Sequence, residues 1–186
     1  MERDGAATSQ KGDQLENACD NRNGNLVLMT GLPAAGKTTI AEMRYGDTHQ
    51  FINCDAIKAT HPDYDPKNPQ DLHAWSQNEC EAQMQELFNN PRNAVYDSTG
   101  CNAERMVRYI EQAQAAGMTT TVCFVIVSME TSLERNSRRE RVVPEAIIRM
   151  KAEDITTAYE IVSDYSDESI VIENEWESAE MDDRIA

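Results

Sequence analysis

The residues from Gly31 to Thr38 have the types and spacing that suit phosphate binding. They fit the pattern G-x-x-x-x-G-K-[ST] without a gap, as Gly31-Leu32-Pro33-Ala34-Ala35-Gly36-Lys37-Thr38. The two glycines let the backbone turn tightly. Main-chain N–H groups around Ala34, Ala35 and Gly36 can then point at an anion. The pattern therefore predicts a loop that holds the phosphates of a nucleotide.

The residues that close this loop supply the charged and metal-binding groups. Lys37 would reach the β- and γ-phosphates of ATP, and the hydroxyl of Thr38 would be a ligand of Mg²⁺. Thr39 would add a main-chain N–H at the start of the following helix. We therefore expect ATP and Mg²⁺ as cofactors. A chance match in an ordinary strand–loop–helix unit is the alternative.

Two carboxylates, Asp55 and Asp97, follow the next two predicted strands. Ligands of an open α/β sheet bind at the carboxyl ends of its strands, so both should face the crevice that holds the phosphate loop. Phosphoryl transfer to an alcohol benefits from a carboxylate that accepts the hydroxyl proton, and a second carboxylate can order Mg²⁺. By position alone either aspartate could do either job, or could only cap the next helix. We take both as catalytic candidates, and Asp97 with Thr38 as a candidate metal site.

An arginine-rich segment follows later in the chain, as Arg135-Asn136-Ser137-Arg138-Arg139-Glu140-Arg141. Arg135 and Arg139 are four residues apart, so on a helix they would share a face. Two guanidinium groups on one side could clamp a triphosphate and the migrating phosphoryl group, as a lid does. The alternative is a solvated helix whose arginines pair with Glu134 and Glu140.

The elements that would position these residues alternate along the chain. Strands are predicted at 25–30, 51–54, 93–96, 120–127 and 169–172, and helices at 37–45, 71–88, 102–116, 131–138 and 145–159. This alternation predicts an α/β fold with a parallel sheet of about five strands, helices on both faces and an arginine-rich lid. We expect a P-loop domain over 24–173, a disordered polar tail over 1–23 and an acidic tail over 174–186.

Composition limits the remaining function classes. No run of about 18 apolar residues exists, which argues against a membrane span, and no apolar stretch follows the first residues, which argues against a secretory signal. The five cysteines form no CxxC pair, so we expect a cytoplasmic protein rather than a disulfide or zinc scaffold. The formal net charge of −16 argues against a general DNA coat, although a local basic patch can still hold phosphates.

Three blocks of residues together resemble the P-loop kinases grouped around phage polynucleotide 5′-hydroxyl kinase, over roughly Leu26 to Tyr159. They are the loop 31–39, the segment 95–99 with 102–105 after it, and the segment 135–139 with Val143-Pro144 after it. The resemblance implies a kinase of nucleic-acid hydroxyl groups with a lid over ATP. It also implies that Asp55 is the general base, and that Arg139 contacts the transferring phosphate with Arg135 beside it.

One substitution bears on the acceptor. That family has Asp-x-x-Arg after the second strand, where the arginine helps to hold the acceptor phosphate, and here the motif is Asp55-Ala56-Ile57-Lys58. Lys58 keeps the charge but loses the two-pronged geometry of arginine. The stretch from Asp55 to Tyr64 is also similar to the zeta-toxin kinases, which phosphorylate a UDP-amino sugar. Kinases of hydroxymethylated bases in phage DNA belong to the same broad group.

The motif by itself leaves two other classes open. A nucleotide-dependent switch would transfer the phosphoryl group to water and would have little need of Asp55. A degenerate P-loop protein would bind nucleotide without catalysis, which the presence of Lys37, Thr38, Asp55, Asp97 and Arg139 disfavours. The sequence does not choose an oligomeric state.

Overall fold

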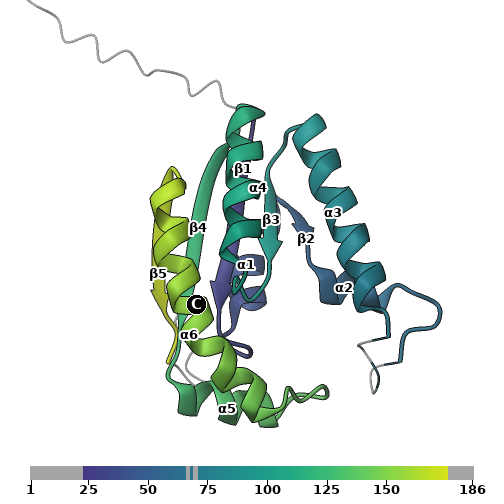
Figure 1. Ribbon diagram of the computed structural model, residues 1–186, viewed down its shortest axis with the longest axis vertical. Coiled ribbons are helices and arrows are strands. Elements are labelled where there is room, and N and C mark those ends of the chain that lie inside the picture. The colour runs from purple at the N-terminus through teal and green to yellow at the C-terminus, as the bar shows by residue number, and fades with distance from the viewer. Residues whose placement is uncertain (1–22, 66–67, 69–70, 176–186) are drawn as a thin grey trace, which may run out of the picture.

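Five parallel strands form a single sheet, and they lie side by side across the centre of Figure 1. A computed structural model describes residues 23–65, 68 and 71–175. In order across the sheet, the strands are β2 (Gln50–Ile52), β3 (Ala94–Asp97), β1 (Asn25–Gly31), β4 (Thr119–Ile126) and β5 (Glu168–Glu173). All four neighbouring pairs are parallel. The expected fold class, a parallel sheet of about five strands, is confirmed.

The central strand β1 is apolar on both faces because helices cover both faces of the sheet. Leu26 and Leu28 pack on one side against α3 (His73–Asn89), α4 (Ala103–Ala115) and α6 (Glu145–Tyr165). Val27 and Met29 pack on the other side against α1 (Lys37–Tyr45). Figure 1 shows α4 and α6 in front of the sheet and α1 behind it. The alternation along one buried strand therefore fixes a three-layer arrangement.

Two short helices lie beyond the carboxyl edge of the sheet, toward which the strand arrows point in Figure 1. They are α2 (Cys54–Ala59) and α5 (Met129–Ser137). The sequence prediction missed α2 and placed residues 51–54 in a strand, but β2 ends at Ile52. The reason is Asn53, whose side-chain oxygen caps α2 by accepting hydrogen bonds from the N–H groups of Asp55 and Ala56. Asp55 consequently lies in the first turn of a helix rather than at a strand end.

The two residues after the expected domain end at 173 contact the rest of the fold. Asn174 is buried, its N–H donates to the carbonyl of Ile126, and its side chain reaches the phosphate loop. The carboxylate of Glu175 accepts hydrogen bonds from Ser128 and Thr131 at the start of α5. The expected tails are otherwise outside the described residues, in 1–22 and 176–186. Among the helices of the described ranges, none has both the length and the apolar character to cross a membrane.

Candidate active site

A cleft of about 490 Å³ opens at the carboxyl edge of the sheet. Its walls come from α1, α2, α3, β3, the loop after β3, α4, α6 and the segment after α5. Of the residues predicted for the site, the cleft brings together Lys37, Thr38, Asp55, Lys58, Asp97 and Arg139. It also adds residues that the sequence did not single out for the site, among them Asn53, Arg105, Arg141 and Lys151. The strand order therefore gathers segments that are more than a hundred residues apart.

The phosphate loop has the backbone conformation that anion binding requires. Ala34 and Gly36 have φ angles of 59° and 88°, in the left-handed region, so the chain curls around a central space. A Cβ on Gly36 would lie 2.4 Å from the side-chain nitrogen of Asn174, so glycine is needed there. Helix α1 then begins at Lys37 without a side-chain cap, which leaves its N-terminus to bind an anion. Ala35 is fully buried, whereas Thr39 is exposed on α1 and is not part of the cleft wall.

Lys37 is buried and folds back over the loop. Its ammonium group donates to the carbonyls of Gly31 and Leu32, with Nζ to oxygen distances of 3.0 and 2.8 Å. Burial lowers the pKa of Lys37 to about 8, and the cations Arg139 and Lys151 act in the same direction, against the opposite effect of Asp97. An anion in the loop would restore the charged form of this lysine.

Thr38 and Asp97 meet in the cleft, as the sequence predicted for a shared metal site. The hydroxyl of Thr38 donates to Oδ2 of Asp97 over 2.6 Å. The amide of Asn53 donates to the same carboxylate oxygen over 2.8 Å. The side chain of Asn53 therefore makes two kinds of contact, because its oxygen caps α2 while its nitrogen orients Asp97. The sequence prediction placed Asn53 inside a strand, and its position is explained only by the end of β2 at Ile52.

These oxygens fit Mg²⁺ better than a metal held by protein groups alone. Within the described ranges, no group of three or more His, Cys, Asp or Glu side chains could hold a metal. Mg²⁺ commonly uses one or two carboxylates together with substrate phosphates and water. Thr38 and Asp97 supply one hydroxyl and one carboxylate beside the phosphate loop, so this donor set suits a nucleotide-bound Mg²⁺.

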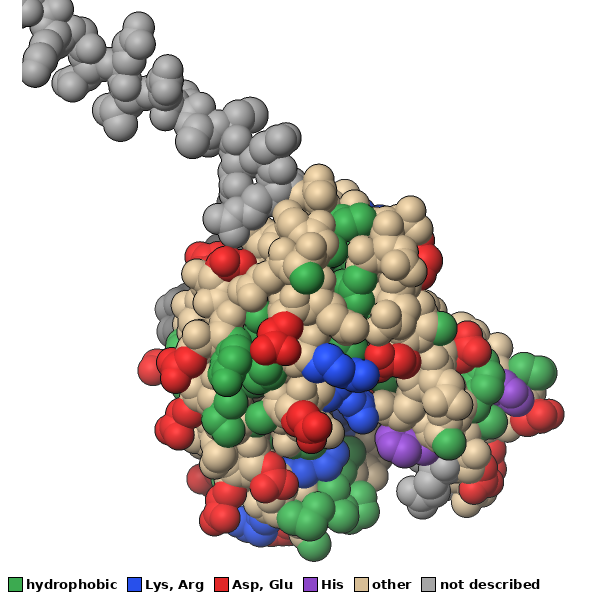
Figure 2. All heavy atoms as spheres, turned by 45° about the horizontal axis from the view of Figure 1, so that its top comes forward, with side chains coloured by type: hydrophobic (Ala, Val, Ile, Leu, Met, Phe, Trp, Pro, Cys, Tyr) green, Lys and Arg blue, Asp and Glu red, His purple; other side chains and the backbone are tan. Residues whose placement is uncertain are grey.

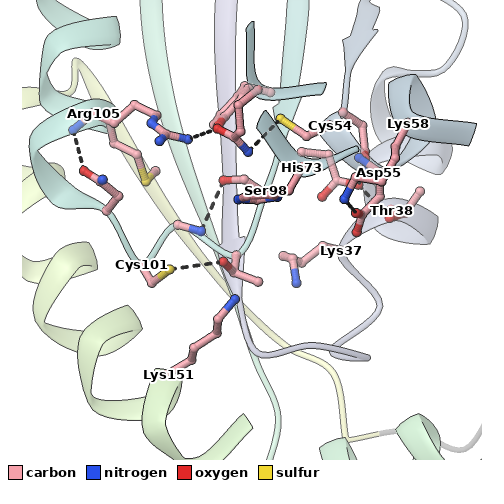
Figure 3. Close-up of a pocket in the computed structure, with 18 of the residues that line it drawn as sticks. Lys37, Thr38, Cys54, Asp55, Lys58, His73, Ser98, Cys101, Arg105 and Lys151 are labelled. Carbon is pink, nitrogen blue, oxygen red and sulfur yellow. Dashed lines mark hydrogen bonds and ion pairs between the residues drawn. The ribbon is translucent and has the colours of Figure 1, made fainter. Parts of the chain in front are cut away.

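Asp55 faces the cleft from α2 and is held by two cations. Its Oδ1 lies 3.0 Å from Nη1 of Arg141. The same oxygen lies 3.4 Å from Nζ of Lys58, and Figure 3 labels both Asp55 and Lys58. Partial burial acts to raise the pKa of Asp55, but the hydrogen bonds and charges of Arg141 and Lys58 outweigh it and hold this pKa below its ordinary value. The lowered pKa keeps this carboxylate ionised at neutral pH. Its side chain is 65% exposed, so it is accessible to a second substrate.

The arginine segment does not form the single helical face that its spacing predicted. Helix α5 ends at Ser137, because the side chain of Asn136 exchanges hydrogen bonds of 2.8 and 3.0 Å with the backbone of Val143 and closes a loop. Arg139 lies in this loop and lines the cleft. Arg135 instead donates to the carbonyl of Asn174 over 2.9 Å and is not part of the cleft wall. The two predicted lid arginines are therefore separated, and Arg141 is the second arginine that the loop brings to the cleft.

The charge of the cleft is opposite to that of the chain. Six cations and two carboxylates line it, whereas the chain carries a formal charge of −16. The cations are Lys37, Lys58, Arg105, Arg139, Arg141 and Lys151. Figure 2 shows Lys and Arg side chains gathered in the middle of one face, with Asp and Glu side chains around them. Such a cleft attracts anionic ligands locally, because at physiological salt the near charges decide.

A model of one protein family matches residues 26–158 of this chain, and its description is AAA domain. Because the match covers most of the chain, the chain belongs to this family. A comparison with curated proteins found no match.

Several solved structures share the fold at low sequence identity. A chain from the PezAT chromosomal toxin–antitoxin system of Streptococcus pneumoniae has 14% identity and a TM-score of 0.60, with 81% of this chain and 68% of that chain covered. A gluconokinase from Sinorhizobium meliloti 1021 has 15% identity and a TM-score of 0.56, with 86% and 87% covered. A chain of the Pnkp1/Rnl/Hen1 RNA repair complex has 16% identity and a TM-score of 0.56, with 74% and 45% covered. The comparisons confirm a P-loop, kinase-like fold.

Proposed function

We propose that this member of the AAA domain family is an ATP-dependent kinase that transfers the γ-phosphate to a hydroxyl group of a nucleic acid, at a 5′-hydroxyl end. The observation that carries this proposal is the position of Asp55. Its exposed carboxylate lines the same cleft as Lys37, Thr38, Asp97 and Arg139. A switch that transfers to water has no need of a second carboxylate on the acceptor side of a phosphate loop.

The chemistry divides the cleft into two halves. In one half, the phosphate loop and Lys37 bind the nucleotide phosphates, while Thr38 and Asp97 would hold Mg²⁺. When bound, Mg²⁺ neutralises charge on the phosphate oxygens. Arg139 stabilises the negative charge of the group in transfer. The bound Mg²⁺ and the protein cations thus favour phosphoryl transfer chiefly by position and charge.

In the other half, Asp55 acts on the acceptor hydroxyl. It accepts the hydroxyl proton as the acceptor oxygen bonds to the γ-phosphorus and the bond from that phosphorus to the β–γ bridging oxygen breaks. ADP leaves with the electron pair of that bond, and Asp55 passes the proton to water. A carboxylate with a lowered pKa suffices as the base, because the transition state of phosphoryl transfer is loose and requires little activation of the nucleophile.

The cations beside Asp55 support an acceptor that is itself anionic. Lys58 is buried and within 3.4 Å of the Asp55 carboxylate, and Arg141 reaches the same oxygen. Arg105 lines the wall from α4 and hydrogen-bonds Gln77 of α3. Phosphate groups that flank the 5′ end of a polynucleotide would meet these cations. The lid residues from Arg135 to Pro144, which resemble those of polynucleotide kinases, favour the same acceptor.

A UDP-amino sugar is the second candidate acceptor. The stretch from Asp55 to Tyr64 is similar to the zeta-toxin kinases, and the net charge of −16 disfavours long polyanions at a distance. Such a sugar carries a diphosphate that the same cations could bind. A hydroxymethylated base in DNA is a third acceptor of the same chemical kind.

Label transfer from γ-labelled ATP to parallel acceptors tests the proposal. The acceptors are a 5′-hydroxyl oligonucleotide, the same oligonucleotide with a 5′-phosphate, a UDP-amino sugar, and 5′-phosphorylated DNA with hydroxymethylated bases. We expect label only on the 5′-hydroxyl oligonucleotide. Label on another acceptor would overturn the polynucleotide assignment but keep the kinase, and release to water independent of any acceptor would overturn the kinase.

A further inference from the structure

Lys151 lines the cleft, but neither the sequence motifs nor the proposed mechanism gives it a role. It lies on α6, near the N-terminal end of that helix, and its side chain lines the cleft. Figure 3 shows it reaching from α6 toward the space between Cys101 and Lys37. Among the residues that the structure describes, its ammonium group has no hydrogen-bond or ion-pair partner. A cation placed in this way is available to a ligand.

The cleft cations divide into two groups by the residues on which they act. Lys58 and Arg141 contact the carboxylate of Asp55, and Arg105 contacts Gln77. Lys151 instead extends toward Lys37, and Arg139 lines the same cleft. Lys151 therefore belongs to the half of the cleft that contains the phosphate loop, although its helix follows the lid in sequence.

Lys37, Arg139 and Lys151 line the same part of the cleft, and their positive charges repel one another unless an anion lies between them. Asp97 is the carboxylate of this half, and its Oδ2 already accepts hydrogen bonds from Thr38 and Asn53. Lys37 starts from inside the loop, where the β-phosphate would lie, whereas Lys151 approaches from α6 on the opposite wall. The terminal phosphate, which carries the most negative charge, would fill the space between these lysines.

We propose that Lys151 binds the γ-phosphate of the bound nucleotide, so that α6 supplies a third protein cation to the group in transfer. This inference deepens the proposed function but rests only on its nucleotide-binding half and needs no particular acceptor. Through this contact, α6, which begins directly after the lid loop, would interact with the nucleotide only when a terminal phosphate is present. With ADP bound, the contact between Lys151 and the nucleotide would be absent.

Binding measurements with two nucleotides separate this role from a general effect on the loop. The affinities for ADP and for a non-hydrolysable ATP analogue, both with Mg²⁺, would be measured by titration calorimetry for the wild type and for Lys151→Gln. We expect the variant to bind the ATP analogue about 10-fold or more weakly, the size of a lost hydrogen bond between charged groups. Its affinity for ADP should stay within about twofold of the wild type.

Two further variants complete the design. Lys151→Arg keeps the charge and should retain most of the affinity for the ATP analogue. Arg149→Ala, on the same helix but ion-paired with Glu145 on the exposed side, should change neither affinity. Equal losses for both nucleotides, or no loss for either, would overturn the inference alone. A wild-type protein that binds neither nucleotide would overturn the proposed function as well.

Discussion

The carboxylate of Asp55 and the guanidinium of Arg141 are paired, with 3.0 Å between Oδ1 and Nη1. Asp55 comes from α2, and Arg141 comes from the loop between α5 and α6, so this pair joins the proposed acceptor side to the proposed lid. The pairing keeps the carboxylate ionised. It also occupies one of the oxygens that would accept a proton, so binding of an acceptor must compete with Arg141 for Asp55.

Removal of Arg141 should shift the pH dependence of transfer. Asp55 works as a base only when ionised, so the rate falls as the pH drops through its pKa. Arg141 holds that pKa below its ordinary value, so Arg141→Ala should raise the pKa and move the acidic fall in rate to higher pH. Profiles of kcat/KM against pH, compared with Arg149→Ala as a control for loss of an arginine, would measure the shift. An unmoved acidic limb would contradict the role of Asp55 as the base.

Substitution of Lys37 should abolish transfer and also change how stability depends on pH. In the folded protein its pKa is about 8, below the ordinary 10.5, so between these values the unfolded chain binds more protons. The free energy of unfolding should therefore rise with pH across this window, by on the order of 3 kcal/mol from this group. Denaturant unfolding at several pH values would show that rise in the wild type but not in Lys37→Met. Equal slopes would contradict a depressed pKa.

Replacement of Asn53 should raise the Mg²⁺ concentration that activity requires, even in a variant whose free energy of unfolding hardly changes. Asn53→Ser can still cap α2 but cannot reach Asp97, so the free energy of unfolding should change by only about 0.5 kcal/mol or less. The Mg²⁺ concentration for half-maximal activity should rise about 10-fold, because the carboxylate loses the donor that orients it. Asn53→Ala should show the same rise and lose about 1 kcal/mol of stability as well. An unchanged Mg²⁺ requirement would contradict this orienting role.

The residue after β5 should support the phosphate loop. Asn174 is buried, and its side chain donates to the carbonyl of Ala35 over 2.8 Å. Asn174→Ala should lower the free energy of unfolding by about 1–3 kcal/mol, because that carbonyl is left without its partner. It should also weaken ATP and ADP binding alike, because both use the loop. Asn90→Ala, which removes an exposed amide at the end of α3, is the control. Unchanged nucleotide affinity in Asn174→Ala would contradict the proposal that Asn174 supports the phosphate loop.

Local sequence patterns predicted the parts of the site that one continuous segment determines. The phosphate loop and α1 depend on glycines and on a motif within eight residues, so their positions were predictable. Asp97 directly follows an apolar strand, and its place at the sheet edge follows from strand direction. The same logic failed for Asp55, because Asn53 caps a helix that begins at Cys54, one residue before Asp55.

The remaining site residues depend on contacts between distant segments. The position of Arg139 depends on how Asn136 bonds to Val143, and the position of Arg135 depends on the carbonyl of Asn174. Helical spacing alone placed these two arginines on one face. Lys151 had no local signal, since an amphipathic helix carries many charges and only packing decides which of them faces a cleft.

The most direct test of the account is a single-turnover assay with a 5′-hydroxyl oligonucleotide. Wild-type protein and Asp55→Asn, each saturated with labelled ATP and Mg²⁺, would be mixed with the oligonucleotide and quenched over time. We predict rapid labelling of the 5′ end by the wild type and a rate slowed by about 100-fold or more in the variant, with ATP affinity unchanged. Equal transfer rates in the two proteins, or no label on the oligonucleotide from the wild type, would contradict a nucleic-acid kinase with Asp55 as its base.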